Sequence, residues 1–294
     1  MNQNALKSDV WLILVTLFAG LGWVFSAEAL VGMTPLLFIG TRFLLAGFIL
    51  TGFGWRALRL LSGQDWRYAL LTGAVMGLAL SCWIMGLSLA DNMGIGAFIA
   101  SLAVVFVPIV GRLLFGTSTS LSTWVAIVVA LVGLAFLRLE DGFSLSASDA
   151  FFLMAALVFS VHFNLNTRFA SQIPALPMTA VQLTLTGMVA LGLATVFEPA
   201  PTLPEINILG WLLASVLIAT CLRFWLQVKA QGLASASHAA VIMTLEPVWA
   251  SLLGLLWFGQ QMTVLQLLGC CLIFSALLVS RWRVLFRRSV QSLG

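Results

Sequence analysis

The chain has 294 residues, of which 61% are hydrophobic and 8% carry a charged side chain, and its mean hydropathy is +1.09. A soluble domain has about 25% charged residues, so this chain cannot cover itself with a hydrated surface, and most of its exterior is expected to face lipid. In lipid the backbone must be paired within helices or a closed barrel. Because the apolar runs are continuous over about 20 residues, they predict helices and not strands.

Ten apolar runs, bounded by charges, glycine or proline, are the predicted membrane spans. They cover residues 10–29, 35–55, 68–88, 93–115, 121–138, 149–170, 177–197, 207–230, 236–259 and 263–282. The connections are mostly too short to fold by themselves, so no soluble domain is expected. The first run lacks a small-residue cleavage signature and is expected to be a retained span, not a signal peptide.

Lysine and arginine are distributed unevenly between the two sides of this arrangement. With a cytoplasmic N-terminus, Arg138 alone lies on the opposite side, Arg42 and Arg223 lie within spans, and the other basic residues lie at cytoplasmic ends. Short loops rich in lysine and arginine stay in the cytoplasm, so both termini are predicted to be cytoplasmic. The net charge of +4 then reflects topology, and no basic face or stacking motif indicates binding to nucleic acid.

The four cysteines fall inside apolar runs, with no disulfide framework and no metal-ligand spacing. A Gly-rich phosphate loop is also missing from the sequence. We therefore expect no cofactor and no bound metal. The expected partners are membrane lipid and a small-molecule substrate. The oligomeric state leaves no clear trace in the sequence, and a monomer is compatible with it.

When the sequence is aligned with itself at a shift of 143 residues, the fourth and fifth spans match the ninth and tenth. The matched pairs are Ile99 with Ile242, Leu102 with Leu245, Val105 with Val248, and Phe115-Gly116 with Phe258-Gly259. This pattern predicts two related halves, residues 1–140 and 148–288. Because each half has an odd number of spans, the second would insert in the opposite direction. Such inverted repeats are typical of secondary transporters, in which the substrate site lies near the midplane between the repeats.

The second half also carries a family resemblance. Residues 233–238 (Leu-Ala-Ser-Ala-Ser-His), residues 245–250 (Leu-Glu-Pro-Val-Trp-Ala) and the glycines at 259 and 269 resemble the repeat of the EamA-type drug/metabolite transporter superfamily. The likeness covers nearly the whole chain. The first half departs more from the family pattern, because the usual proline would align near Val104 and here lies at Pro108. The second half has Gly259-Gln260 where Gly-Glu is usual.

The resemblance implies ten helices and transport of small metabolites, typically export across the bacterial inner membrane. Amino-acid exporters, including those for aromatic amino acids, are one branch that the chain is similar to.

Glu246 is the only acidic residue that lies away from a predicted helix end or loop. A charge at the bilayer centre costs about 2.5–3.5 kcal/mol on insertion scales, so the side chain should face inward and find a partner. Pro247 cannot donate the main-chain hydrogen bond to Met243, so the span is expected to kink and to line an internal wet space. Two interpretations stay open: Glu246 joins two helices through Arg42 or Arg223, or it serves coupling or binds a substrate amine.

Three further polar side chains are candidates for a substrate site. Arg223 could bind a carboxylate or extend toward the cytoplasmic face. His162 and Asn166 are four residues apart and share a helix face. They could line a cavity or form interhelical hydrogen bonds, which contribute around 0.6 kcal/mol each on average.

Four tryptophans lie deeper in their spans than the others, which are near span ends. Each could simply pack, but together they suggest an aromatic-lined pocket for a flat or apolar side chain. The predicted substrate site therefore comprises Trp23, Trp83, His162, Asn166, Arg223, Trp225, Glu246 and Trp249.

The sequence thus predicts an all-α integral membrane protein that exports small metabolites as a secondary transporter. Amino acids, and aromatic or other apolar ones in particular, are the favoured substrates, and two five-helix halves would expose a central site to each side in turn. Another metabolite class within the same superfamily is the alternative. A lipid-modifying membrane enzyme would need a catalytic cluster, and a channel would need rings of like charge or a carbonyl filter. The sequence shows neither, so the protein is not expected to be an enzyme.

Overall fold

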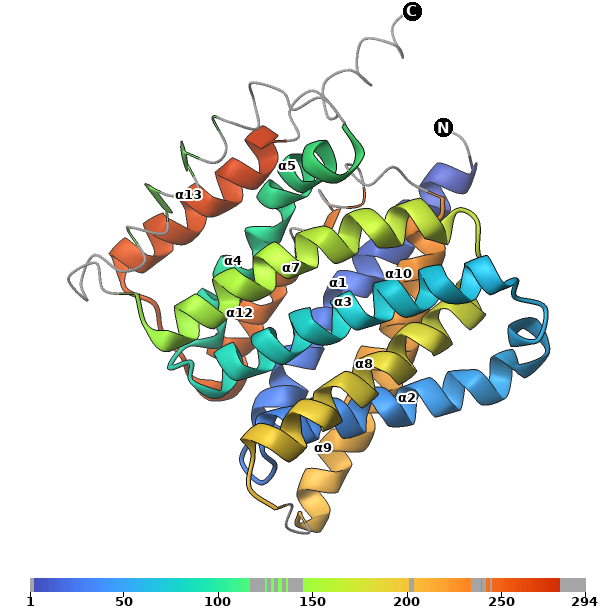
Figure 1. The fold of residues 1–294 in the computed structure, drawn as a ribbon. Coiled ribbons are helices and arrows are strands. Elements are labelled where there is room, and N and C mark those ends of the chain that lie inside the picture. Colours follow the sequence, from blue (N-terminus) through green and yellow to red (C-terminus); the bar gives the residue numbers. More distant parts are fainter. Residues whose placement is uncertain are drawn as a thin grey trace, which may run out of the picture.

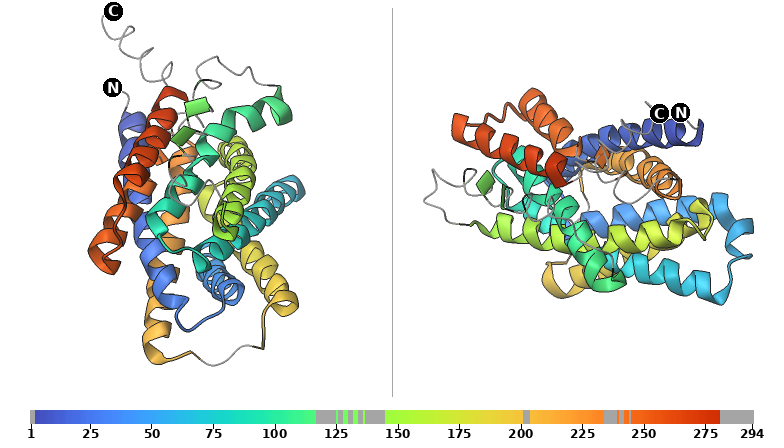
Figure 2. Two further views of the ribbon diagram at one scale, coloured as in Figure 1. Left: turned by 90° about the vertical axis from the view of Figure 1, so that its left-hand side faces the viewer. Right: turned by 90° about the horizontal axis from the view of Figure 1, so that it is seen from above.

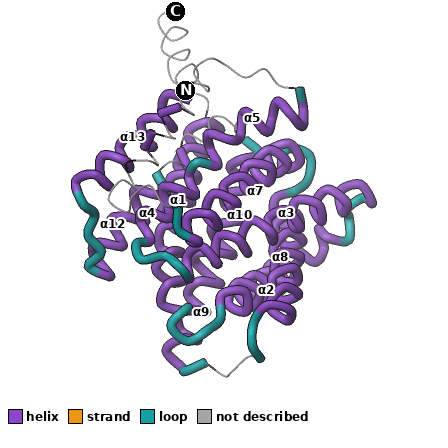
Figure 3. Tube along the Cα trace, turned by 60° about the vertical axis from the view of Figure 1, so that its left-hand side comes forward, coloured by secondary structure: helices purple, strands orange, loops and turns teal. Residues whose placement is uncertain are grey.

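The structure, a computed structural model, describes residues 3–116, 125, 128–129, 132–133, 136, 145–200, 204–233, 239, 242–243 and 245–280. Within these residues the elements are helices, and no strand occurs (Figure 1, Figure 3). They are α1 (Gln3–Ala29), α2 (Pro35–Leu58), α3 (Gly63–Ser88), α4 (Met93–Ser101), α5 (Ala103–Phe115), α7 (Ala147–Ala170), α8 (Ala175–Phe197), α9 (Ile206–Val216), η1 (Leu217–Leu222), α10 (Arg223–Gln231), α12 (Glu246–Phe258) and α13 (Val264–Ser280).

Seven stretches of helix in the described residues are long and apolar enough to cross a membrane by length and composition. Two of them combine shorter elements: α4 with α5, and α9 with η1 and α10. α12 and most of α13 are shorter apolar helices. The all-helical class is confirmed, whereas the number ten stays a prediction, because the expected span 121–138 lies almost wholly outside the described residues.

Short polar motifs fix the starts of α3 and α7. The Ser62 side chain accepts a hydrogen bond from the Asp65 N–H, and the Asp65 carboxylate accepts one from the Ser62 N–H. Ser146 and Asp149 form the same capping box at α7. These bonds satisfy N–H groups that a helix start otherwise leaves unpaired.

α2 and α8 make the most extensive helix–helix contact among the described residues. Glycines allow their backbones to approach closely. A Cβ atom added at Gly47 would lie 2.6 Å from the Thr184 nitrogen, and one added at Gly187 would lie 2.7 Å from the Leu44 Cα. The two helices therefore touch backbone to backbone in the middle of the bundle.

A carboxylate at the end of α8 caps the start of α2. Glu198 accepts hydrogen bonds from the N–H groups of Leu36 and Leu37, at 2.6 and 2.9 Å, and from the Thr34 hydroxyl at 2.6 Å. An acidic group at a helix N-terminus is favourable because it faces the positive end of the helix dipole. The α2–α8 pair is thus fixed both at its middle and at one end.

The first helix of each predicted half packs against the other half. α1 contacts α9, η1, α10 and α12, while α7 contacts α3, α4 and α5. α3 and α7 lie side by side in Figure 1, and the start of α1 and the end of α13 lie at the same end of the bundle in Figure 1 and Figure 2. The groups of helices that pack together in space therefore mix the two halves of the sequence.

α5 and α12 share their local geometry. Each has 13 residues and is preceded by a leucine in the right-handed helical region, Leu102 or Leu245. That leucine donates its N–H to the isoleucine carbonyl three residues earlier, at 3.1 Å in both segments. Both helices end at a glycine with positive φ, 66° at Gly116 and 64° at Gly259, a conformation that glycine adopts without strain. These are the positions that the shift of 143 residues brings together.

The kink expected at Pro247 takes the form of a new helix start. α12 begins at Glu246, with Pro247 in its first turn. At that position the N–H that proline lacks would have no helical partner anyway. The Glu-Pro pair is therefore explained by a helix that begins inside the apolar run.

We predict that Gly47→Ala lowers the unfolding temperature of the purified protein by several degrees, because α2 and α8 must move apart and overpacking costs about 1–3 kcal/mol. Gly52→Ala on the same helix is the control, since nothing lies within 4 Å of a Cβ at that position. Thermal unfolding in detergent measures both. Equal effects of the two substitutions would contradict the close contact.

Candidate functional site

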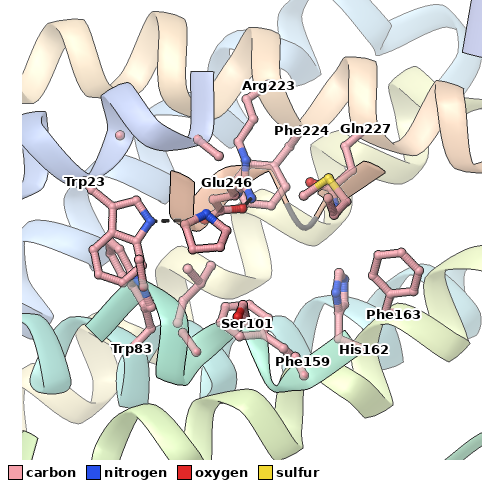
Figure 4. Close-up of a pocket in the computed structure, with 18 of the residues that line it drawn as sticks. Trp23, Trp83, Ser101, Phe159, His162, Phe163, Arg223, Phe224, Gln227 and Glu246 are labelled. Atoms are coloured by element: carbon pink, nitrogen blue, oxygen red, sulfur yellow. Dashed lines mark hydrogen bonds and ion pairs between the residues drawn. The ribbon is translucent and has the colours of Figure 1, made fainter. Parts of the chain in front are cut away.

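A cavity of about 130 Å³ lies where the interrupted spans meet. The first residues of α5 and α12, including Ala103 and Glu246, form part of its wall, and α1, α2, α3, α4, α7, η1 and α10 supply the rest. Figure 4 shows the side chains that surround it. A cavity of about 150 Å³ can hold benzene, so this space is of the right order for a small organic solute.

The Glu246 carboxylate has two donors in this cavity. Trp23 Nε1 donates to Oε1 at 3.1 Å, and Arg223 Nη2 lies 3.4 Å from Oε2. The start of α12 adds a favourable dipole, which typically contributes 0.3–1 kcal/mol to an acidic group. Residue counting left two arginines as possible partners of Glu246, and the structure places Arg223 there.

The Arg223–Glu246 pair is loose. It has a single contact and not the two of a bidentate pair, and Arg223 Nε has no hydrogen-bond partner. Arg223 could therefore bind a further carboxylate, and Glu246 an ammonium group. Among the described residues, Glu246 is the only acidic one in the cavity wall, and no group of three or more His, Cys, Asp or Glu in that part of the chain could hold a metal ion.

Arg42 also reaches the cavity but has a different environment. It is 4% exposed, and Nε, Nη1 and Nη2 donate to Thr220 Oγ1 at 2.6 Å, Ser26 Oγ at 2.9 Å and the Ala219 carbonyl at 3.0 Å. Ala219 and Thr220 belong to the π-helical turn η1. This geometry is rare in proteins overall but often occurs at functional sites. Arg42 thus joins α1, α2 and η1 through neutral acceptors.

Aromatic rings form one end of the cavity. The Trp23 ring meets the Trp83 ring edge to face, with centroids 4.8 Å apart and an interplanar angle of 82°. The Phe152 ring lies 5.6 Å from Trp23 on another side. Trp23 and Trp83, two of the predicted site residues, line the cavity.

His162 and Gln227 lie at the other end of the cavity (Figure 4). Their side chains are 4% and 6% exposed. His162 Nε2 and Gln227 Oε1 are buried without a hydrogen-bond partner. His162 was predicted from the sequence, whereas Gln227 was not. The sequence could have indicated Gln227 as a site residue, because it lies four residues after Arg223 on the same helix face.

Asn166 lies outside the cavity wall, one turn beyond His162. Its Nδ2 donates to Gln231 Oε1, and its Oδ1 accepts from Gln182 Nε2 at 2.9 Å. Gln182 Nε2 also donates to Thr72 Oγ1 at 2.8 Å. These four buried residues, here called the amide cluster, connect α3, α7, α8 and α10.

The structure places two predicted tryptophans away from the cavity wall. Trp225 lies beside Lys229, whose Nζ is 5.0 Å from the ring centroid. Trp249 packs against α1, where a Cβ at Gly20 would lie 2.6 Å from the Trp249 Cβ. Trp23, Trp83, His162, Arg223 and Glu246 are therefore the predicted residues that the fold brings together.

We predict that Arg42→Lys lowers the unfolding temperature, because an ammonium group cannot reach the three acceptors that the guanidinium fork serves. Each lost interhelical bond contributes around 0.6 kcal/mol on average, so a shift of a few degrees is expected in a thermal scan. Arg59→Lys, at the residue directly after α2, is the control, because Arg59 is exposed and lies over the Trp55 ring. Unchanged stability of Arg42→Lys would contradict the assigned role.

Comparisons with known proteins agree with this architecture. The profile of the EamA-like transporter family matches residues 6–139 and again residues 146–282. An uncharacterized transporter of Archaeoglobus fulgidus is 26% identical over 279 residues, which cover 95% of this chain and 87% of that protein. A protein solved by crystallography has the same fold, with a TM-score of 0.67, 18% identity and coverage of 94% of this chain and 98% of the other. The chain belongs to the EamA-like transporter family.

Proposed function

We propose that the protein is a secondary transporter that exports small amphipathic metabolites, with amino acids as the favoured class and aromatic or other apolar ones preferred among them. The observation that carries this proposal is the pair of opposite charges, Arg223 and Glu246, beside aromatic rings inside a membrane protein. An amino acid would place its carboxylate on Arg223, its ammonium group on Glu246 and its side chain against the apolar wall.

The loose contact between the two charges supports this mode of binding. A buried charge that loses its partner is strongly unfavourable. A zwitterion supplies a new partner to each charge at the same time, so the Arg223–Glu246 contact can open without leaving either group unpaired. A solute with one charge would satisfy only one of the two residues.

Two helix contacts on opposite sides of the cavity are the proposed gates. On one side α7 meets α10 at the amide cluster and at Gly232, where a Cβ would lie 2.8 Å from the Ala170 carbonyl oxygen. On the other side α4 meets α12, where a Cβ at Gly94 would lie 3.1 Å from the Ser251 Cα. Opening one contact while the other stays closed would expose the cavity to one side at a time.

The moving bodies would contain helices from both halves of the sequence. One body consists of α7 with α3, α4 and α5, and the other of α1 with α9, η1, α10 and α12, following the contacts of the two exchanged first helices.

The distribution of basic residues sets the proposed orientation of the two gates relative to the cytoplasm. With the N-terminus in the cytoplasm of a bacterium, the gate at the amide cluster faces the cytoplasm, because Ser8 near the start of α1 donates to the Ala230 carbonyl at 3.2 Å, beside that gate. Export from the inner side would begin with the opening of this gate.

We predict that purified protein in proteoliposomes shows saturable amino-acid transport and that Glu246→Gln lowers it at least about tenfold, because an amide cannot hold the ammonium group as a carboxylate does. Glu28→Gln is the control. Glu28 also accepts a hydrogen bond from a tryptophan, Trp257 Nε1 at 2.8 Å, but this bond is solvent-exposed and lies outside the cavity. Linear flux, or equal rates for Glu246→Gln and the unmodified protein, would reject the proposal.

We also predict that a cross-link across the gate at the amide cluster stops transport. In a background without native cysteines, Asn166→Cys with Gln231→Cys is joined by a short bifunctional thiol reagent, and transport is measured before and after. The control is Tyr68→Cys with Phe169→Cys. The rings of Tyr68 and Phe169 stack 4.0 Å apart between α3 and α7 within one body, so this link should leave transport unchanged. Full transport through the linked gate would refute its opening.

A further inference from the structure

We infer that the His162–Gln227 end of the cavity is a hydrogen-bonding subsite for a neutral polar group at the far end of the substrate, with a hydroxyl group as the best fit. The inference rests on the proposed binding of the charged head by Arg223 and Glu246. It assigns a second recognition element to the same cavity, at the end away from Trp23 and Trp83 (Figure 4).

The evidence for the subsite is a pair of unpaired polar atoms. His162 Nε2 and Gln227 Oε1 lack hydrogen-bond partners although both side chains are more than nine-tenths buried. Buried polar atoms nearly always have a partner, and each exception calls for one. Both residues line the cavity and come from α7 and α10, which lie on either side of it. A solute in the cavity can therefore supply the partner for both.

The chemistry of these two atoms selects a neutral group. Gln227 Oε1 only accepts hydrogen bonds, while an imidazole Nε2 can donate. A hydroxyl matches both, because it donates to the amide oxygen and accepts from the imidazole, and a carboxamide can do the same. A carboxylate has no proton to donate to Gln227. An ammonium group would lie near the Arg223 cation on the same helix.

The spacing along α10 sets where this group must lie in the substrate. Gln227 is four residues after Arg223 on the same face, which corresponds to about 6 Å along the helix axis. A hydroxyl directly beside the charged head, as in serine, does not extend that far. A ring with its hydroxyl opposite the point of attachment, as in tyrosine, does. The cavity wall also includes the apolar rings of Phe159, Phe163 and Phe224.

Tyrosine and phenylalanine form a matched pair for the test, since they differ by this one hydroxyl. Competition against transport of a labelled amino acid in proteoliposomes gives the apparent affinity for each. We expect tyrosine to be preferred at least about tenfold, because a site built to bind a hydroxyl rejects the analogue that lacks it. Thermal stabilisation of the purified protein by each ligand provides an independent measure of binding.

Two variants test whether the preference for tyrosine over phenylalanine depends on the subsite. Gln227→Met keeps a similar side-chain size without the amide oxygen, and His162→Phe keeps a ring without the nitrogen. In each, the preference for tyrosine should fall toward one while phenylalanine still binds. Gln172→Met, at an exposed position after α7, is the control and should keep the full preference.

The outcomes separate the two proposals. Equal affinity of the unmodified protein for tyrosine and phenylalanine overturns the subsite and leaves amino-acid transport standing. A preference that persists in both Gln227→Met and His162→Phe also overturns the subsite. If the unmodified protein transports a labelled amino acid but binds neither tyrosine nor phenylalanine, the subsite is overturned and amino-acid transport stands. If it transports no amino acid, the proposed function is rejected, and the subsite is rejected with it.

Discussion

Inside a hydrocarbon layer the Glu246 carboxylate has no bulk water to bind, and its need for donors organises the centre of the protein. Trp23 on α1 and Arg223 on α10 supply them, so three helices are held together at the start of α12. The same requirement acts on Arg42, whose guanidinium joins α1, α2 and the π-helical turn through neutral acceptors. The polar groups that a membrane interior must satisfy are thereby concentrated around one cavity. Purely apolar helices would be expected to pack closely and fill this space.

The packing of the helices gives this cavity walls that belong to different parts of the chain. α2 and α8 cross with backbone contact at Gly47 and Gly187, and Glu198 fixes the start of α2. Around this pair, the first helix of each predicted half packs into the other half. A solute in the cavity therefore touches helices from both halves at once, which is the condition for a bound molecule to influence how they move relative to each other.

Much of this arrangement could be predicted from the sequence, because it follows from periodicity and composition. Continuous apolar runs predict the helices, and the shift of 143 residues relates the two spans that the structure shows to be interrupted. The sequence predicted a break only at Pro247, and the interruption at Leu102 was not expected. Residue counting gives depth in the membrane but not direction around the bundle, so it could not choose between Arg42 and Arg223. Trp225 is two residues from Arg223 and therefore points to another face of the helix. Asn166 shares the face of His162, but Gln182 from α8 and Gln231 from α10 occupy its amide. Such competition between distant residues cannot be read from local sequence.

The two interrupted spans have a mechanical consequence. At Leu102 and at Leu245 the regular ladder of main-chain bonds is replaced by a tighter turn, so the segment beyond each break can tilt without carrying the segment before it. α5 runs from its break toward the end of the bundle where α1 begins, and α12 runs toward the opposite end (Figure 1). The protein thus has two interrupted spans, and the cavity lined by Trp23, Arg223 and Glu246 lies beside both interruptions.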